Sequence, residues 1–344
     1  MSEFVLSEKN IQKYLEKLNI NSQSILSVKY LPGGVINHVF SVKLKDKTLI
    51  LKQGLESAKS IFNLKLNKER IKNEFTAGVF FKKYSKSAFF TDMQHFDQDF
   101  NILIKKDSLE EKDSLSTLLS RGLVDVEVGE KISKELAMIH NKLMHREDIM
   151  KSFDNKKTFY QIKINLQCLD ITDDKKIREK IEEFIRSYLY HEYTLIHGDL
   201  APKNILITKD KKVIFIDFEE AHYGNPSLDI GYLLAHYYLN AIINNKIFDK
   251  YSTLIKRMFE IYISNLSNEI HTTKLEYEKE VSMFIGIFLL SRVDGKAKAP
   301  ELVNNNDKEN VRKIAKSIIV DNIDTIEKIN IICKSLLQDG KPIA

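Results

Sequence analysis

Three short segments near the start of the chain alternate apolar and polar residues. They are Ile25–Tyr30, His38–Leu44 and Thr48–Gln53. A period of two is typical of strands that bury one face, and turn residues separate the segments at Leu31–Gly34 and Lys45–Lys47. The pattern therefore predicts neighbouring antiparallel strands in a small sheet. An amphipathic, charged helix is expected before them, between Met1 and Leu18.

The pattern changes to a helical period after the third strand. Over Asn67–Lys83, apolar and small residues recur at about 100° per residue, which places them on one side of a helix. These residues are Ile71, Phe75, Gly78 and Val79. We expect this helix to pack on the sheet, and we expect Phe100–Ile104 to form a further strand.

Beyond residue 106, helical patterns predominate. They cover Leu115–Leu119 and Glu130–Leu143, and Ile314–Leu337 predicts one amphipathic helix or a helix pair. Three short apolar runs separated by polar turns are the exception: Thr194–His197, Ile205–Thr208 and Val213–Asp217. We predict an α+β fold of two lobes, with a small antiparallel-sheet-plus-helix lobe over residues 1–106 and a larger, mainly helical lobe over residues 107–344. A chain of 344 residues is long enough for both.

Composition and charge narrow the class of protein. The 43% of hydrophobic and 29% of charged residues are the balance of an ordered globular protein. The formal net charge of +5 arises from 53 basic and 48 acidic residues, and the lysines are scattered instead of forming one block. We therefore expect no nucleic-acid partner. The sequence does not predict an oligomeric state.

The cellular compartment is inferred from cysteines and apolar runs. Cys168 and Cys333 are far apart and lack metal-ligand spacing, which is ordinary for a reducing compartment. The N-terminal segment lacks the apolar core of a signal peptide, and the strongest apolar run, Met283–Leu290, is too short to cross a bilayer. We expect a soluble cytoplasmic protein without a membrane partner.

The segment LIHGDLAPKNILI, at residues 195–207, carries the first candidate chemistry. Asp199 and Asn204 are separated by four residues, as in the Asp-x-x-x-x-Asn loop of kinases. A hydroxyl that attacks a phosphate needs a carboxylate to orient it and take its proton, and the metal on the phosphates needs an oxygen ligand. Asp199 is the candidate base and Asn204 a candidate Mg²⁺ ligand. His197 is expected to brace the loop instead of taking part in catalysis.

A second carboxylate follows the apolar run VIFID. Asp217 stands at its end, where a hard oxygen ligand could hold Mg²⁺ on phosphate oxygens. The alternatives are structural: Asp199 would bond within its own turn, and Asp217 would be the N-cap of a helix over residues 218–221. Both segments in this order, each after an apolar strand, favour phosphoryl transfer.

The phosphates of the donor nucleotide also need cations and amides. Lys52 lies in the strand TLILKQ, and a carboxylate must pair with it to fix its position; the alternative is an ordinary surface lysine. Glu74 lies at the edge of the predicted buried helix face, whereas Glu69 points largely to solvent, so Glu74 is the expected partner. Gly33 and Gly34 would let backbone amides approach a phosphate, although a plain hairpin turn explains them nearly as well.

These motifs resemble those of the aminoglycoside phosphotransferase and choline kinase superfamily, which are small-molecule kinases with a protein-kinase-like fold. The resemblance rests on LILK at 49–52, Glu74, ELAMIH at 135–140, HGDLAPKNIL at 197–206, IDFEEAHYGNPSLDIGYLL at 216–234 and RVDGK at 292–296. It implies an N-terminal lobe that covers the nucleotide, and a C-terminal lobe that carries the catalytic loop and the metal and acceptor sites. ATP or GTP would be the co-substrate and Mg²⁺ the cofactor. It also assigns Asp229 a supporting role beside the catalytic loop.

Departures from the ordinary protein-kinase pattern point to a small-molecule acceptor. Ala201 replaces the lysine that protein kinases carry two residues after the base, and Glu219 replaces the glycine after Asp-Phe. DFE and YGNP…DIG are closer to the metabolic members, such as choline, ethanolamine and methylthioribose kinases. Glu219 and Glu220 are possible substrate contacts.

The acceptor itself stays open between choline, ethanolamine, a sugar and an aminoglycoside. Choline would need aromatic faces around its ammonium group. Residues of this kind are Tyr223, Tyr232, Tyr237 and Phe284. Two alternatives to a metabolic kinase remain, namely an aminoglycoside-modifying enzyme and a catalytically silent nucleotide-binding scaffold of the same fold.

Overall fold

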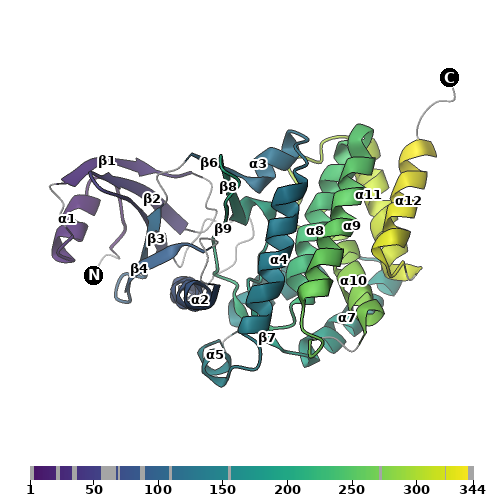
Figure 1. Cartoon of the computed structure of the whole chain (residues 1–344), viewed down its shortest axis with the longest axis horizontal. Coiled ribbons are helices and arrows are strands. Elements are labelled where there is room, and N and C mark those ends of the chain that lie inside the picture. Colours follow the sequence, from purple (N-terminus) through teal and green to yellow (C-terminus); the bar gives the residue numbers. More distant parts are fainter. Residues whose placement is uncertain are drawn as a thin grey trace. The chain divides into compact units, whose positions relative to one another are not determined.

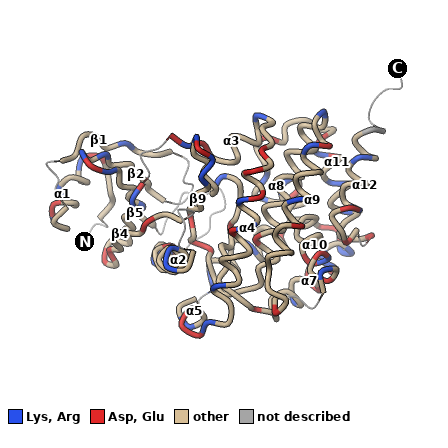
Figure 2. The backbone as a smooth tube through the Cα atoms, viewed as in Figure 1, with Lys and Arg blue, Asp and Glu red and all other residues tan. Residues whose placement is uncertain are grey.

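The computed structural model describes residues 4–20, 24–32, 37–55, 67–68, 70–85, 90–107, 111–153, 156–270, 273–321 and 323–339. The chain forms two compact units, which Figure 1 shows coloured along the sequence. The first unit contains Met1–Glu111 and Ile214–Glu220, and the second contains Lys112–Val213 and Ala221–Ala344. Lys and Arg are interspersed with Asp and Glu along the backbone of both units (Figure 2).

The first unit is built on a five-stranded antiparallel sheet. Its strands are β1 (Ile25–Tyr30), β2 (Asn37–Leu44), β3 (Thr48–Gly54), β4 (Asp92–Asp97) and β5 (Ile102–Asp107), in the order β1-β2-β3-β5-β4. The three strands predicted first are confirmed, and β5 begins two residues later than expected. β4 was not predicted, because an edge strand whose side chains are mostly exposed or half-buried has no apolar alternation.

Two helices cover this sheet. Helix α1 (Ile11–Lys17) buries Ile11, Tyr14 and Leu15 in one core with apolar side chains of β2, β3 and β5. Helix α2 (Arg70–Ser85) packs against β3, β4 and β5. Its predicted buried face is right at Ile71 but wrong at Val79, which is 43% exposed. The buried face of α2 includes Glu74, whose charge is paired with Lys52 and Lys105 of the same unit.

The second unit is mainly helical. Its longer helices are α4 (Val126–Lys142), α7 (Lys175–Tyr190), α8 (Ser227–Ile243), α9 (Phe248–Asn265), α10 (Lys274–Val293), α11 (Asn305–Val320) and α12 (Ile326–Asp339). Shorter ones are α3 (Leu115–Ser120), α5 (Glu147–Ser152), α6 (Lys157–Phe159), the π-helix η2 (Tyr160–Leu169), and the 3₁₀ turns η3 (Pro202–Asn204) and η4 (Asn245–Ile247). The final predicted segment is thus a helix pair. None of the helices in the described residues combines the length and the apolar character that a membrane crossing needs.

Short strands carry the loops of chemical interest. β7 (Thr194–Ile196) pairs with β10 (His222–Gly224), and β8 (Ile205–Thr208) lies between β6 (Lys112–Ser114) and β9 (Val213–Phe215). The three predicted runs are confirmed as strands, but β7 ends before His197 and β9 ends before Asp217. Both residues therefore lie on loops directly after a strand.

Helices α8 and α10 approach closely at Gly231. A Cβ atom there would meet Phe284 Cβ at 2.7 Å and the Val281 carbonyl oxygen at 3.2 Å. We expect Gly231→Ala to lower the free energy of unfolding by about 1–2 kcal/mol, because the overpacking cost exceeds the gain of about 1 kcal/mol in helix propensity. Urea unfolding would measure this. Ser187→Ala on the exposed face of α7 is the control and should cost under about 0.5 kcal/mol; an equal loss in both variants would contradict the packing argument.

Candidate active site

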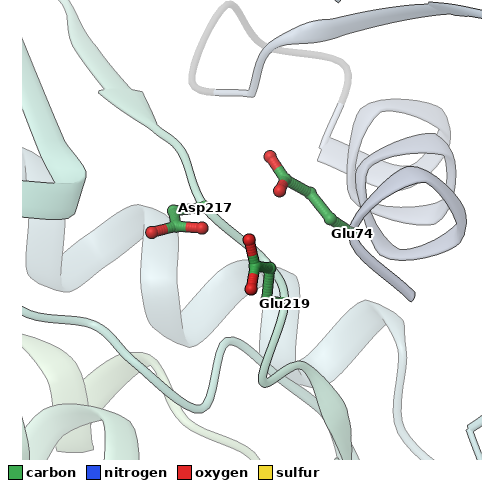
Figure 3. Close-up of side chains that lie close together, drawn as sticks. All are labelled: Glu74, Asp217 and Glu219. Atoms are coloured by element: carbon green, nitrogen blue, oxygen red, sulfur yellow. The ribbon is translucent and has the colours of Figure 1, made fainter. Parts of the chain in front are cut away.

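Lys52 on β3 is the centre of a charge cluster in the first unit. Its Nζ lies 2.6 Å from Glu74 Oε2, 2.6 Å from Asp217 Oδ1 and 2.5 Å from Glu219 Oε1. Figure 3 shows these three carboxylates converging, Glu74 from α2 and the other two from the loop after β9. The contacts with Glu74 and Asp217 are hydrogen bonds donated by the Lys52 ammonium group, and the contact with Glu219 is an ion pair.

Two further cations and one amide complete the cluster. Lys105 Nζ lies 2.7 Å from Glu74 Oε1, and Arg70 Nε lies 2.9 Å from Glu219 Oε2. Asn37 Nδ2 donates to Glu219 Oε1 at 2.5 Å. Three cations therefore face three carboxylates, and charge balance is what allows groups as buried as these to stay ionised.

The pKa values of the cluster follow from this pairing. Burial alone would lower the pKa of Lys52, but the charges of Asp217, Glu219 and Glu74 raise it well above its usual range. For the Glu74 carboxyl, burial alone would raise the pKa, but the charges of Lys105 and Lys52 hold it below its usual value. Both groups are charged at neutral pH.

The carboxylates of the cluster also suit a divalent cation. One oxygen each of Glu74, Asp217 and Glu219 lies within 4.8 Å of the others, and hard oxygen ligands are what Mg²⁺ prefers. The Asp217 side chain is 35% exposed, whereas those of Glu74 and Glu219 are 0% and 11% exposed. Asp217 is thus the most accessible of the three. It is not a helix N-cap, because no helix forms over residues 218–221.

The second unit holds Asp199 on the loop after β7. Lys163 of η2 contacts Asp199 Oδ1 at 2.8 Å, and Asn204 Nδ2 donates to Asp199 Oδ2 at 2.9 Å and to its carbonyl oxygen at 2.8 Å. The exposed Lys203 lies 3.4 Å from Oδ2. Burial would raise the pKa of the Asp199 carboxyl, but Lys163 and Lys203 hold it well below its usual range. The Asp199 carboxylate is therefore ionised at neutral pH and can accept a proton.

Asn204 is oriented by these contacts. Both hydrogen bonds to Asp199 use its Nδ2 atom. Its Oδ1 atom, which is the one able to bind a cation, takes no part in them. The Asn204 side chain therefore presents an amide oxygen of the kind that binds Mg²⁺, in agreement with the ligand role predicted for it.

Asp229, near the start of α8, contacts the backbone that leads to Asp199. It accepts hydrogen bonds from the amides of His197 at 2.7 Å and Gly198 at 2.9 Å, and lies 3.3 Å from His140 Nε2. Gly198 has a φ of 80°, which a glycine adopts without strain. Burial would raise the pKa of Asp229, but the hydrogen bond with His140 lowers it. These contacts fix the turn before Asp199, and His197 Nδ1 accepts from the Asp199 amide at 3.3 Å.

Several charged residues of these clusters were missed by sequence reasoning. Lys105 follows the apolar run ILI, and Lys163 stands between two isoleucines. A lysine among apolar residues is the signal that could have found them. Arg70 and Asn37 carry no such signal, because their partner Glu219 is remote in sequence. Gly33 and Gly34 lie outside the described residues, and Glu220 is buried at 8% exposure.

Comparison with known proteins supports the predicted resemblance. Residues 151–252 match the model of the phosphotransferase enzyme family. The chain is 25% identical over 303 residues to 4-hydroxytryptamine kinase of Psilocybe cyanescens, covering 78% of this chain and 82% of that protein. It is 25% identical over 240 residues to methylthioribose kinase of Bacillus cereus, covering 61% of this chain and 59% of that enzyme. The chain thus spans less than two thirds of the second relative.

The fold is shared with a solved kinase. The ethanolamine kinase of Plasmodium vivax superposes with a TM-score of 0.55 at 13% identity, over 90% of this chain and 86% of that one. The expected α+β, protein-kinase-like fold is confirmed by this likeness. The resemblance to the aminoglycoside phosphotransferase and choline kinase superfamily is supported by the family match over residues 151–252 and by the related kinases.

Proposed function

We propose, from the premise that this chain is a phosphotransferase acting on an alcohol group, that it transfers the γ-phosphoryl group of ATP or GTP to a small metabolite. One observation carries the proposal. The Asp199 carboxylate is buried, oriented by Asn204 and kept ionised by Lys163, which is the state that a general base for a hydroxyl requires.

Each predicted residue has a role in this proposal. Asp199 orients the acceptor hydroxyl and takes its proton, while Asn204 and Asp217 are the proposed Mg²⁺ ligands. When bound, the magnesium ion neutralises charge on the phosphate oxygens of the nucleotide. Asp229 holds the turn before the base through two amide hydrogen bonds.

Lys52 is the proposed phosphate contact, with Glu74 as its anchor. Because three carboxylates surround its ammonium group, a phosphate oxygen must take the place of one of them. Glu74 is the partner that can stay, since it is fully buried and Lys105 also holds it. Asp217, being the more exposed, is the partner that the phosphate replaces.

The test is a screen of hydroxyl compounds for magnesium-dependent phosphate transfer, read by the mass of the product. The panel includes methylthioribose, 4-hydroxytryptamine, choline, ethanolamine and aminoglycosides. We expect a phosphorylated product that requires both the nucleotide and Mg²⁺. Magnesium-dependent nucleotide binding without any phosphorylated product would instead favour a silent scaffold.

A further inference from the structure

A buried lysine contacts the proposed base. Lys163 lies in the π-helix η2 and is fully buried. Its ammonium group contacts Asp199 Oδ1 at 2.8 Å and donates to Gln167 Oε1 at 3.1 Å. Removing an ammonium from water is costly, and π-turns are frequent at functional sites. This placement therefore indicates a role in the chemistry of Asp199 and not in packing alone.

The same ammonium group covers the aromatic surface beside Asp199. Lys163 Nζ lies 4.0 Å from the ring centroid of Tyr232 and 5.8 Å from that of Phe288. The Arg292 guanidinium carbon lies 5.6 Å from the Tyr232 centroid. Ligands with an ammonium group are held by aromatic faces of this kind. In this chain, Lys163 and Arg292 already lie over the ring of Tyr232.

The other aromatic residues that could surround an ammonium group are closed off. Tyr223, Tyr237 and Phe284 are 2%, 1% and 0% exposed. The Tyr223 hydroxyl is also engaged with the backbone of His145 and Tyr193. These side chains are part of the core and offer no face to a ligand.

Cations of the second unit lie close to Asp199 and to the ring of Tyr232 beside Lys163. Lys163 and Lys203 approach its two carboxylate oxygens, and Arg292 contacts Tyr232, His236 and the Ala297 carbonyl. Among the described residues, none of these partners of Arg292 is a carboxylate. Burial, and then the charge of Arg292, hold the pKa of His236 well below its usual range, so its ring is neutral. A cation carried by the acceptor would meet like charges here.

We propose that Lys163 positions the Asp199 carboxylate and selects acceptors that carry no cationic group beside the reacting hydroxyl. The inference rests on the proposed function and concerns which alcohols that function uses. In the reaction, the acceptor oxygen bonds to the γ-phosphorus, the bond from that phosphorus to the bridging oxygen breaks, the hydroxyl proton passes to Asp199, and the nucleoside diphosphate leaves. Sugar-like and other uncharged alcohols satisfy this condition, whereas choline and ethanolamine do not.

The charge selection is tested with choline and its uncharged carbon isostere, in which a tert-butyl group replaces the trimethylammonium group. Both alcohols are offered at equal concentration as acceptors and as inhibitors of nucleotide hydrolysis. We expect the wild type to use or bind the isostere at least about tenfold better, and Lys163→Met to reduce this ratio to within about threefold. An equal or better response to choline in the wild type would overturn the selection.

The positioning role of Lys163 is tested by measuring hydrolysis of the nucleotide, in which water replaces the metabolite as the acceptor of the phosphoryl group. We expect Lys163→Met to lower kcat for magnesium-dependent hydrolysis at least about tenfold, with the nucleotide KM within about twofold. Lys203→Met is the matched comparison, because it removes an exposed cation from the same carboxylate and should have a smaller effect. Equal kcat values in Lys163→Met and wild type would overturn this inference alone. Absence of all hydrolysis and transfer in the wild type would overturn the proposed function.

Discussion

Asp199→Asn is expected to lower the rate of phosphoryl transfer by at least about a hundredfold, because the amide cannot take the proton of the acceptor hydroxyl. Single-turnover transfer to the best acceptor of the screen, measured with saturating nucleotide and Mg²⁺, gives the rate. Nucleotide affinity, measured by calorimetry, should change by less than about threefold, since Asp199 acts on the acceptor. A rate within a few-fold of the wild type would contradict the assignment of the base.

The substitution also leaves Lys163 buried without its carboxylate. Removing one partner of a buried ion pair costs about 3 kcal/mol of unfolding free energy, so the single variant will be less stable. The double variant Asp199→Asn with Lys163→Met removes both charges and should regain much of that stability. If its transfer rate stays at least about a hundredfold low, the loss is chemical. If activity returns with stability, the role of Asp199 is structural.

Local pattern was sufficient for four of the five strands of the sheet and for the pairing of Lys52 with a helix carboxylate. Alternation predicted the strand that carries Lys52, and the helical angle placed Glu74 at the edge of the buried face of the predicted helix. The structure places Lys52 Nζ in contact with Glu74. Both inferences need only the periods of a strand and a helix, which the sequence carries directly.

Lys163 illustrates what local pattern omits. Its partner Asp199 is 36 residues away, so no short spacing connects the two. It also lies in a π-helix, whose wider turns shift the faces that a period of 3.6 residues would assign. A periodic pattern that assumes an α-helix cannot place this side chain.

Glu219 shows the same limit for a charged cluster. The sequence made it a possible substrate contact, but the structure surrounds its carboxylate with Lys52, Arg70 and Asn37. These partners come from β3, α2 and β2, and only the folded first unit brings them together. A long-range charge network depends on tertiary packing, which no spacing along the chain encodes.

Lys52→Met is expected to lower phosphoryl transfer by about a hundredfold or more, because a positioned cation on the transferring phosphate is lost. The same change should strengthen the binding of Mg²⁺ in the absence of nucleotide. In the wild-type cluster three cations balance three carboxylates; without Lys52 the carboxylates of Glu74, Asp217 and Glu219 face only two. Thermal unfolding with and without Mg²⁺ should show a larger rise in Tm for the variant than for the wild type.

Lys105→Met separates the contact with phosphate from the net charge of the cluster. It removes the same charge, but the Lys105 ammonium group forms its ion pair with Glu74 alone among the described residues, while Lys52 remains in place. Mg²⁺ should therefore raise the Tm of both variants by similar amounts, because both clusters carry one excess negative charge. Transfer should fall much less in Lys105→Met than in Lys52→Met, since only Lys52 is proposed to reach the phosphate. Equal losses of transfer would mean that charge balance, and not a phosphate contact, is what Lys52 provides.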